Sequence, residues 1–257
     1  MTTYDWKQGY ARIAERGPFV YGLTNYIAAN LSANVLLAAG AGPAIGAASD
    51  WTTTFPAGAN AVWINTAALM SSDEDSLRTV ARTAHQAGTP WVLDPVAVGA
   101  GAAKYDDFVR SLLEFRPTAI RGNASELIAL AGGAATGKGV ETTVDSSAAI
   151  TAVGEFAARI GTVVAVSGPV DYLSDGSRIV EVPGGDVRLT RVTGAGCALG
   201  ALTAAAIFAT GDALQGAVVA HSAYALAAER AGARTKGTGS FAVALVDELS
   251  LLNEVTE

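Results

Sequence analysis

Short apolar runs rich in β-branched residues alternate with longer amphipathic segments along most of the chain. The runs are apolar at consecutive positions, a pattern typical of strands that are buried on both faces of a sheet. We therefore predict strands at residues 19–24, 61–65, 91–96, 118–123 and 162–168.

Helix signals fill the intervals between these strands. Residues 71–88, SSDEDSLRTVARTAHQAG, begin with a serine cap and acidic residues and end at Gly88, as a helix should. Similar helices are predicted at 106–115, 124–133 and 146–161. Strands that alternate with helices predict right-handed βαβ units and a largely parallel sheet with helices on both faces, which gives three αβα layers.

The later part of the chain has a different pattern. Residues 171–182, DYLSDGSRIVEV, predict two antiparallel strands around an Asp-Gly turn. Three helices are then expected near 195–209, 212–231 and 240–252. Because no linker, charge block or internal repeat interrupts the chain, we expect a single α/β domain over residues 1–257.

Composition narrows the classes of partner. Half of the residues are hydrophobic and 16% are charged, against roughly a quarter in an average protein. Such a sparsely charged surface suggests that other subunits cover part of it. The net charge of -7 argues against nucleic acid or an anionic membrane surface as a partner, but it does not exclude a nucleotide.

Cysteine content and hydropathy bear on the compartment. A single cysteine leaves no intramolecular disulfide, which fits a reducing environment. The first residues lack a signal-peptide core, and no apolar stretch reaches the roughly 20 residues that a bilayer requires. We therefore expect a soluble cytoplasmic protein that does not bind membranes.

Polar residues follow the predicted strands at the points where the strands end. In open parallel sheets, ligands bind beyond the carboxyl ends of the strands. The residues at these positions are Thr24, Asn25, Asn65, Asp94, Arg121, Gly122, Asn123, Ser167 and Gly168. A carboxylate, an arginine, amides and a hydroxyl at one edge suit an anionic substrate that carries a metal ion.

Two glycine-rich stretches resemble nucleotide motifs without matching them. Residues 132–139, GGAATGKG, place Gly139 where a P-loop needs serine or threonine, so a surface turn is favoured. Residues 194–200, GAGCALG, have the third glycine one position late for a dinucleotide fingerprint.

The second of these stretches nevertheless carries chemistry. Gly194 and Gly196 allow backbone N–H groups to approach a ligand, and the positive end of the following helix points to the same place, which suits a phosphoryl group. Cys197 lies in the first turn, where the helix dipole should favour the thiolate as a base for a substrate hydroxyl. The alternative is that Cys197 is a small residue that packs the helix and has no catalytic role. The residues alone do not decide between the two, because phosphoryl transfer can proceed with little help from a base.

Two acidic residues are candidates for a metal site. Asp94 ends a predicted strand, and Glu126 lies three residues after Asn123 at the start of a predicted helix. Carboxylate oxygens suit Mg²⁺. The alternative for Glu126 is that it complements a helix N-terminus.

The arginine and histidine residues also have functional and structural interpretations. Arg121 follows a strand and suits a phosphate group, although a structural ion pair is an alternative. His85 and His221 show no paired ligand spacing, and we expect them to be surface or packing residues.

These motifs together make the chain resemble the hydroxyethylthiazole kinases of the ribokinase-like superfamily. The matching stretches run in order across nearly the whole chain: LTNYIAANLSANVLLAAGAGP, LDPVAVGAG, IRGNASELIALAGG, VSGPVDYLSDG, VTGAGCALGALTAA and GTGSF. The pairing of IRGNASE with a TGxGC turn is specific, because related kinases usually carry aspartate where Cys197 stands. The resemblance implies a ribokinase-like fold and ATP-dependent phosphorylation of the hydroxyl of 4-methyl-5-(2-hydroxyethyl)thiazole, for thiamine phosphate biosynthesis or salvage.

The resemblance also implies residue roles. Cys197 would be the catalytic residue facing the substrate hydroxyl. The implied ATP-binding residues are Arg121, Asn123, Ser167 and Gly196, with serine at 167 in place of the usual threonine. The implied Mg²⁺ residues are Asp94 and Glu126, and the implied substrate-binding residues are Asn25, Ile45 and Gly194. The resemblance further implies a homotrimer with active sites between subunits.

Three departures from the family pattern affect substrate preference more than reaction type. Ile45 stands where a methionine that contacts the thiazole is expected. Ala67 and Ala68 replace a glycine and a hydroxyl residue, and the stretch DPVAVGAG has substitutions at Ala97 and Gly101.

Three rival functions remain. A hydroxymethylpyrimidine or sugar kinase, and a nucleotide-dependent NAD(P)H-hydrate dehydratase, would both be expected to carry aspartate at position 197. A non-catalytic binding protein of the thiamine pathway would have no need of Asp94, Arg121, Glu126 and Cys197 together.

Overall fold

The computed structural model describes residues 5–48, 50–132 and 146–253 of the chain. Except for Gly132, the stretch 132–139 lies outside the described residues, so the expectation of a surface turn there stays a prediction. No helix within the described ranges is long and apolar enough to cross a membrane.

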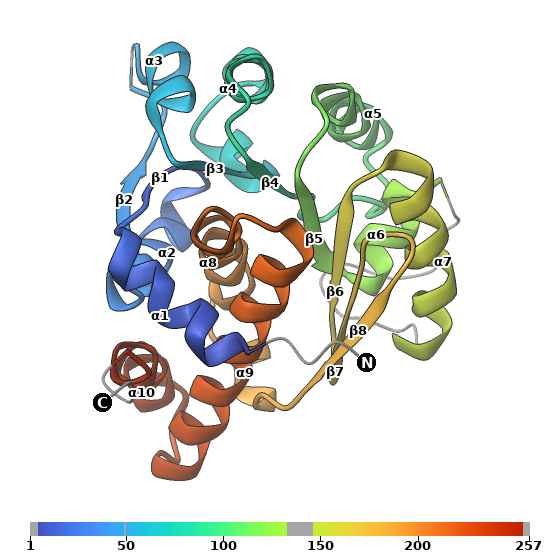
Figure 1. Ribbon diagram of the computed structural model, residues 1–257. Helices are drawn as coiled ribbons and strands as arrows, with labels where there is room; N and C mark the ends of the chain where they lie inside the picture. The colour runs from blue at the N-terminus through green and yellow to red at the C-terminus, as the bar shows by residue number, and fades with distance from the viewer. Residues whose placement is uncertain (1–4, 49, 133–145, 254–257) are drawn as a thin grey trace.

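The described part of the chain forms one eight-stranded sheet with the order β2-β1-β3-β4-β5-β6-β7-β8 (Figure 1). The strands are β1 Phe19–Leu23, β2 Gly42–Ile45, β3 Ala61–Asn65, β4 Trp91–Asp94, β5 Ala119–Asn123, β6 Val163–Ser167, β7 Val170–Ser174 and β8 Ile179–Pro183. All pairs from β2 to β6 are parallel, whereas the β6–β7 and β7–β8 pairs are antiparallel. The expected α/β class with late antiparallel strands is confirmed.

Helices cover both faces of this sheet, which gives three layers (Figure 1). One layer contains α1 Trp6–Arg16, α2 Tyr26–Ala38, α8 Ala195–Thr210, α9 Ala213–Arg234 and α10 Thr238–Leu251. The other contains α3 Trp51–Gly58, α4 Glu74–Ala87, α5 Ala103–Ser111, α6 Ala124–Leu130 and α7 Ser146–Ile160. Three short 3₁₀ helices complete the described elements: η1 Thr66–Met70, η2 Leu112–Phe115 and η3 Val187–Arg191.

A separate hydrophobic core lies on each face of the sheet, and consecutive strand residues alternate between them. Trp63 packs against α8, while its neighbours Val62 and Ile64 belong to the core on the other face, where α4 lies. All five residues of β3 are buried. This double burial explains why the strands have continuous apolar sequences.

Several element boundaries differ from those predicted. The strand predicted at 91–96 ends at Asp94, because Pro95 has no N–H for the ladder and Val96 N–H turns back to the Asp94 carbonyl. The cap of α4 is Asp73 instead of a serine, and Asp73 Oδ1 accepts the Ser76 N–H at 2.7 Å. Gly88 does end α4 in a left-handed conformation, as predicted.

The predictions did not include the first helices and the short strand β2. Helix α2 packs against both α8 and α10, and it also exposes the apolar side chains of Ile27 and Leu37, so its sequence has no clear amphipathic period. Helix α1 does carry a strong amphipathic pattern and the Asp5 cap, which are sufficient signals in the sequence.

The α8 and α9 helices form a tightly packed pair against the sheet. A Cβ atom at Gly216 of α9 would lie 2.4 Å from the Ile207 Cα of α8, so only glycine permits this approach. Helix α8 itself is buried along most of its length. Its N-terminus is therefore held in a fixed place relative to the carboxyl ends of the parallel strands.

Candidate active site

The carboxyl ends of the central parallel strands bring four polar side chains to one edge of the sheet. Asn65 ends β3 and is paired in register with Asp94, which ends β4. In the same way Asn123 of β5 is paired with Ser167 of β6. The residues predicted to follow the strands thus do share an edge.

Asp94 lies at the centre of this edge and is fully buried. Its Oδ2 accepts a hydrogen bond from Asn65 Nδ2 at 3.1 Å, and its Oδ1 lies 3.7 Å from Arg121 Nη1. Within the described residues, Oδ1 has no hydrogen-bond partner. Burial raises the pKa of Asp94 to about 7 despite the attraction of Arg121.

Arg121 crosses from β5 toward the end of β6. Its Nε and Nη2 donate to Ser167 Oγ at 3.2 and 2.9 Å, and its side chain is 11% exposed. Burial opposes the charge, but the carboxylates of Asp94 and Glu126 keep the pKa of Arg121 above its ordinary value. The guanidinium is thus a permanent positive charge in a sheltered place, as phosphate binding requires.

Glu126 forms a capping box at the start of α6. Its Oε2 accepts the Asn123 N–H at 2.9 Å, while Asn123 Oδ1 accepts the Glu126 N–H. Its Oε1 accepts the Ala97 N–H, also at 2.9 Å. Burial raises the pKa of Glu126, and these backbone hydrogen bonds oppose the shift. Both oxygens are therefore engaged, which favours a contact with a metal ion through water over direct ligation.

The turn after β4 contains a strained residue. Ala97 has a φ of 62°, in the left-handed region that costs a residue with a Cβ atom about 1–2 kcal/mol. Gly101 in the same turn has a φ of 93°, which glycine adopts freely. The hydrogen bond from Ala97 to Glu126 holds the turn in this conformation.

The N-terminus of α8 lies against Arg121. Gly194 is the N-cap with a φ of 84° and has no side chain that could cap the helix, so N–H groups of the first turn are left for a ligand. A Cβ at Gly196 would lie 3.0 Å from Arg121 Nη1, and a Cβ at Gly194 would lie 3.1 Å from the Ala28 Cα. A side chain at either position would therefore be crowded, and at Gly194 the left-handed φ favours glycine as well.

The expectation that Cys197 is a thiolate is wrong for the free protein. Burial and the negative charge of Asp94 raise the pKa of the Cys197 thiol to about 12, and Arg121 and a hydrogen bond with Asn65 only partly oppose this. At this position desolvation outweighs the helix dipole, which would favour the thiolate. Cys197 is a neutral thiol next to Asp94 and Arg121.

The residues expected to bind the substrate are spread along the same edge. Asn25 caps α2, with its Oδ1 accepting the Ala28 N–H at 2.8 Å, and Ala28 is the residue that Gly194 contacts. Ile45 ends the outermost strand β2, which β1 separates from β3. The structure thus brings Asn25 and Gly194 together and leaves Ile45 farther along the edge.

One residue that the sequence does not assign to the site lies beside this cluster. His221 of α9 is fully buried, as a packing residue would be, but its Nδ1 also lies 2.6 Å from Asp171 Oδ2, a contact that the sequence does not predict. The other histidine, His85, is exposed on α4 as expected. The available signal was a histidine in the middle of an otherwise apolar helix.

Among the residues that the structure describes, no group of three or more His, Cys, Asp or Glu side chains is placed to hold a metal ion. Mg²⁺ often takes only one or two carboxylates from the protein and keeps waters and substrate phosphates as its other ligands. Asp94 Oδ1, which accepts no hydrogen bond among the described residues, therefore fits a magnesium ion that arrives with a nucleotide.

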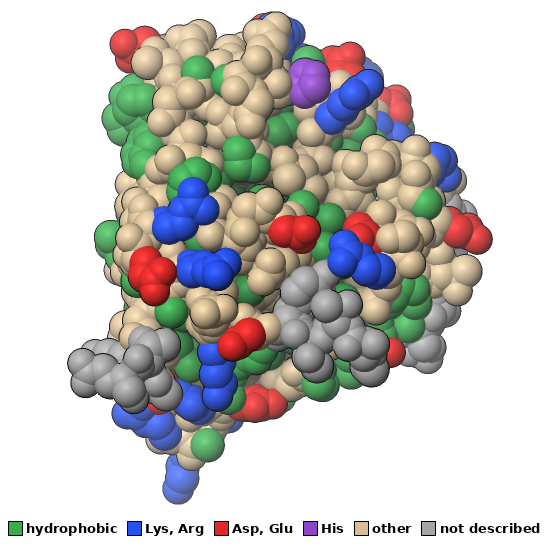
Figure 2. All heavy atoms as spheres, in the orientation of Figure 1, with side chains coloured by type: hydrophobic (Ala, Val, Ile, Leu, Met, Phe, Trp, Pro, Cys, Tyr) green, Lys and Arg blue, Asp and Glu red, His purple; other side chains and the backbone are tan. Residues whose placement is uncertain are grey.

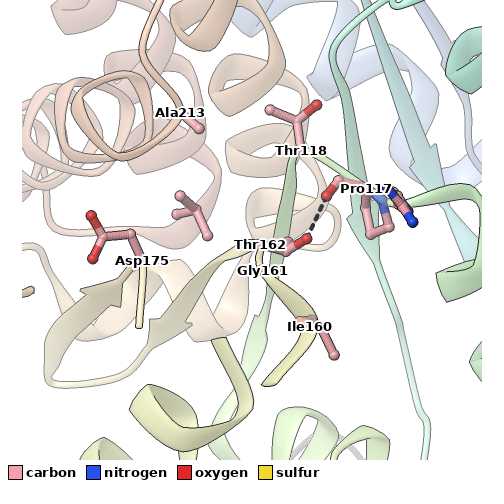
Figure 3. Close-up of a pocket in the computed structure, with 9 residues that line it drawn as sticks. Pro117, Thr118, Ile160, Gly161, Thr162, Asp175 and Ala213 are labelled. Atoms are coloured by element: carbon pink, nitrogen blue, oxygen red, sulfur yellow. Dashed lines mark hydrogen bonds between the residues drawn. The ribbon is translucent and has the colours of Figure 1, made fainter. Parts of the chain in front are cut away.

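Charged side chains are scattered over one face of the molecule, and a hollow lies at the opposite edge of the sheet from the site. Figure 2 shows acidic and basic side chains interspersed over one face among apolar and neutral ones. A hollow of about 550 Å³ lies at the opposite, amino-terminal edge of the sheet, beside Arg116, Thr162 and Asp175 (Figure 3). Because parallel sheets bind ligands at the carboxyl edge, this hollow is not the candidate site.

Comparison with known proteins identifies the family. The model of the hydroxyethylthiazole kinase family matches residues 10–254. The chain belongs to this family. The hydroxyethylthiazole kinase of Burkholderia thailandensis is 65% identical over 247 residues, which cover 96% of this chain and 95% of that protein.

Solved structures agree with this assignment. A hydroxyethylthiazole kinase from Pyrococcus horikoshii OT3 has a TM-score of 0.83 and 33% identity and covers 96% of this chain and 92% of its own. An ADP/ATP-dependent NAD(P)H-hydrate dehydratase from Bacillus subtilis has a TM-score of 0.64 at 14% identity, with 98% of this chain and all of that chain (100%) covered, so it shares the fold alone. The predicted ribokinase-like fold and family resemblance are confirmed.

The strain at Ala97 leads to a stability prediction. Ala97→Gly should raise the free energy of unfolding by about 1 kcal/mol, because glycine adopts the left-handed φ without the Cβ penalty. Urea unfolding monitored by fluorescence measures the change. Ala103→Gly, in the first turn of α5, is the control and should lower stability by about 0.5–1 kcal/mol. A loss of stability in Ala97→Gly would contradict the assigned strain.

The protonation state of Cys197 can be tested directly because it is the only cysteine in the chain. Iodoacetamide at pH 8 should alkylate the folded protein about tenfold or more slowly than the same chain in denaturant, because only the thiolate reacts. Mass spectrometry over time gives both rates. A folded protein that reacts as fast as the denatured chain would mean that the thiolate is present after all.

Proposed function

We propose that this protein transfers the γ-phosphoryl group of ATP to the hydroxyl of hydroxyethylthiazole, giving the thiazole phosphate used for thiamine phosphate. Membership of the hydroxyethylthiazole kinase family carries this proposal. The cluster of Asp94, Arg121 and Cys197 at the N-terminus of α8 supports it, because it combines the groups that phosphoryl transfer needs.

The nucleotide phosphates are assigned to the carboxyl ends of β5 and β6. Arg121 and Ser167 are already hydrogen-bonded to each other, so a phosphate oxygen that joins them meets prearranged donors. Asn123 lies opposite Ser167 in the sheet. The N–H groups near Gly196 hold the phosphoryl group as its charge develops, and the positive end of α8 adds to the attraction.

Magnesium is assigned to Asp94, with Glu126 acting through water. When bound, the ion neutralises phosphate charge during the transfer. Asn65 orients the Asp94 carboxylate and leaves Oδ1 available. Glu126 keeps the turn at Ala97 and the strand end at Asn123 in place through its two backbone hydrogen bonds.

Cys197 is assigned as the catalytic residue that faces the substrate hydroxyl. As a neutral thiol it orients the hydroxyl by hydrogen bonding, and it does not remove the proton beforehand. This suffices in a loose transition state, in which the proton leaves late and passes to a phosphoryl oxygen. Asn25, Ile45 and Gly194 are assigned to the substrate pocket, where Ile45 gives it an apolar wall.

Release of ADP from Mg-ATP tests this function. Hydroxyethylthiazole should stimulate release, while a hydroxymethylpyrimidine and ribose should not, and hydrated NADH should not be dehydrated. Cys197→Ala should lower kcat by about ten- to a hundredfold, since it removes the group that orients the hydroxyl. Cys197→Ser, which keeps a hydrogen-bonding group, should lose less.

The outcomes separate the rival functions. Faster turnover of the pyrimidine alcohol or of ribose would assign the protein to another kinase reaction. Thiazole binding without ADP release would make it a binding protein. Thiazole-dependent release that Cys197→Ala leaves undiminished would keep the kinase and assign Cys197 to packing.

We further propose that the chain is a single domain over residues 1–257, works in the cytoplasm and assembles as a homotrimer with active sites between subunits. Large apolar side chains exposed next to the site edge support the assembly: Tyr26 is 69% exposed, Ile27 48% and Met70 54%. Light scattering should give the mass of three chains, and Tyr26→Glu should reduce it. A monomeric mass at micromolar concentration would contradict the trimer.

A further inference from the structure

The turn that follows Ser167 is tied to helix α9 through Asp171. Asp171 Oδ1 accepts the Gly168 N–H at 2.9 Å, and its Oδ2 contacts Nδ1 of the fully buried His221 at 2.6 Å. Both carboxylate oxygens are thus engaged. This connection fixes the backbone directly after Ser167, the residue that holds the Arg121 guanidinium.

The first turn of α8 is tied to the same helix through Tyr224. The Tyr224 hydroxyl donates to the Ala195 carbonyl at 2.8 Å, and the residue is only 3% exposed. Ala195 is the first residue of α8 and directly precedes Gly196 and Cys197. The hydrogen bond therefore fixes the backbone from which the first-turn N–H groups point.

The two connections come from one face of one rigid helix. His221 and Tyr224 are three residues apart, so their side chains leave α9 on the same side. The close approach at Gly216 holds α9 against α8, and α9 also packs against β6 and β7. Helix α9 thus contacts both segments that border the Arg121 guanidinium.

Electrostatic effects also connect Asp171 and Tyr224 with Arg121. Burial opposes the charge of Arg121, but the carboxylate of Asp171 is among those that raise its pKa. Burial raises the pKa of Tyr224, and the positive charge of Arg121 opposes that rise. Asp171, Tyr224 and Arg121 therefore belong to one electrostatic neighbourhood.

Packing alone does not account for His221. Its Nε2 is buried without a hydrogen-bond partner among the described residues, which costs free energy that an apolar side chain of similar size would not. The contact with Asp171 is what this position gains from a histidine. We therefore expect His221 to hold Asp171 in place, a role that an apolar side chain could not fill.

We propose that His221 and Tyr224 are positioning residues that set the separation between the Ser167–Asp171 turn and the first turn of α8, and thereby the affinity for nucleotide phosphates and the rate of phosphoryl transfer. This inference rests on the proposed function, because the two segments hold phosphates only if the protein binds ATP there. Neither side chain is assigned a contact with the substrates.

The chain offers a matched pair of variants for the test. Tyr224→Phe removes one buried hydroxyl that donates to a backbone carbonyl beside the site. Tyr10→Phe removes another, which donates to the Leu249 carbonyl at 2.9 Å and is 1% exposed, far from the site edge. A purely structural role predicts equal effects of the two substitutions on stability and activity.

The proposal predicts a difference in kinetics. Tyr224→Phe should raise KM for ATP about three- to tenfold and lower kcat, with KM for hydroxyethylthiazole unchanged, while Tyr10→Phe leaves all three at the parent values. Melting temperatures should fall equally in both variants. Equal kinetics in the two variants would overturn the role of Tyr224.

The contact between Asp171 and His221 can be tested with two substitutions of Asp171, one that removes the contact and one that keeps it. Asp171→Ala should reproduce the kinetic change of Tyr224→Phe. Asp171→Asn should restore most of the activity, since its amide oxygen can still accept the Gly168 N–H and its NH₂ can donate to His221 Nδ1 in the tautomer that carries the proton on Nε2. Asp171→Ala with parental kinetics would overturn the role of His221.

Binding of Mg-ADP, measured by calorimetry, separates this proposal from the proposed function. Affinity should fall about three- to tenfold in Tyr224→Phe and Asp171→Ala relative to Tyr10→Phe, whichever alcohol is the acceptor. If the parent protein binds Mg-ADP but does not phosphorylate the thiazole, the proposed substrate is wrong. The positioning role is then decided by the Mg-ADP affinities of the variants alone. Parental affinity in both variants, or no binding by the parent, would overturn the positioning role.

Discussion

Arg121 carries a guanidinium into a sheltered position between the carboxylate of Asp94 and the hydroxyl of Ser167. A buried charge is costly unless it is paired and hydrogen-bonded, so the surrounding residues are constrained by it. A Cβ at position 196 would lie 3.0 Å from Arg121 Nη1, so a larger residue there would push on the guanidinium. Removal of Asp94 or Ser167 would leave the charge under-compensated, so the strand ends and the start of α8 form one interdependent unit.

The sequence predicted those parts of the site that follow from strand pattern. Asn65, Asp94 and Ser167 were expected at one edge because continuous apolar runs precede them, and the parallel register places them there. The protonation state of Cys197 could not be predicted, because it depends on how the folded chain desolvates the thiol and on the nearby charge of Asp94. The contact between His221 and Asp171 joins residues 50 positions apart, which no local pattern reveals.

The departures from the family pattern differ in their physical meaning. Ala97 keeps the left-handed turn that glycine would adopt without strain, and the hydrogen bond to Glu126 compensates for part of that cost. Ile45 ends the outermost strand of the parallel part, and β1 separates that strand from β3. In the proposed assignment, Ile45 shapes an apolar wall of the substrate pocket, while the charged residues at the ends of β4 and β5 serve the phosphates.

A crystal structure with Mg²⁺, a non-hydrolysable ATP analogue and hydroxyethylthiazole tests the central assignment most directly. The account predicts the terminal phosphate at the first turn of α8, within hydrogen-bond distance of the Gly196 or Cys197 N–H and of Arg121, with the thiazole hydroxyl between that phosphate and the Cys197 thiol. A nucleotide bound elsewhere, such as in the hollow beside Arg116 at the opposite edge, or a hydroxyl directed away from Cys197, would contradict it.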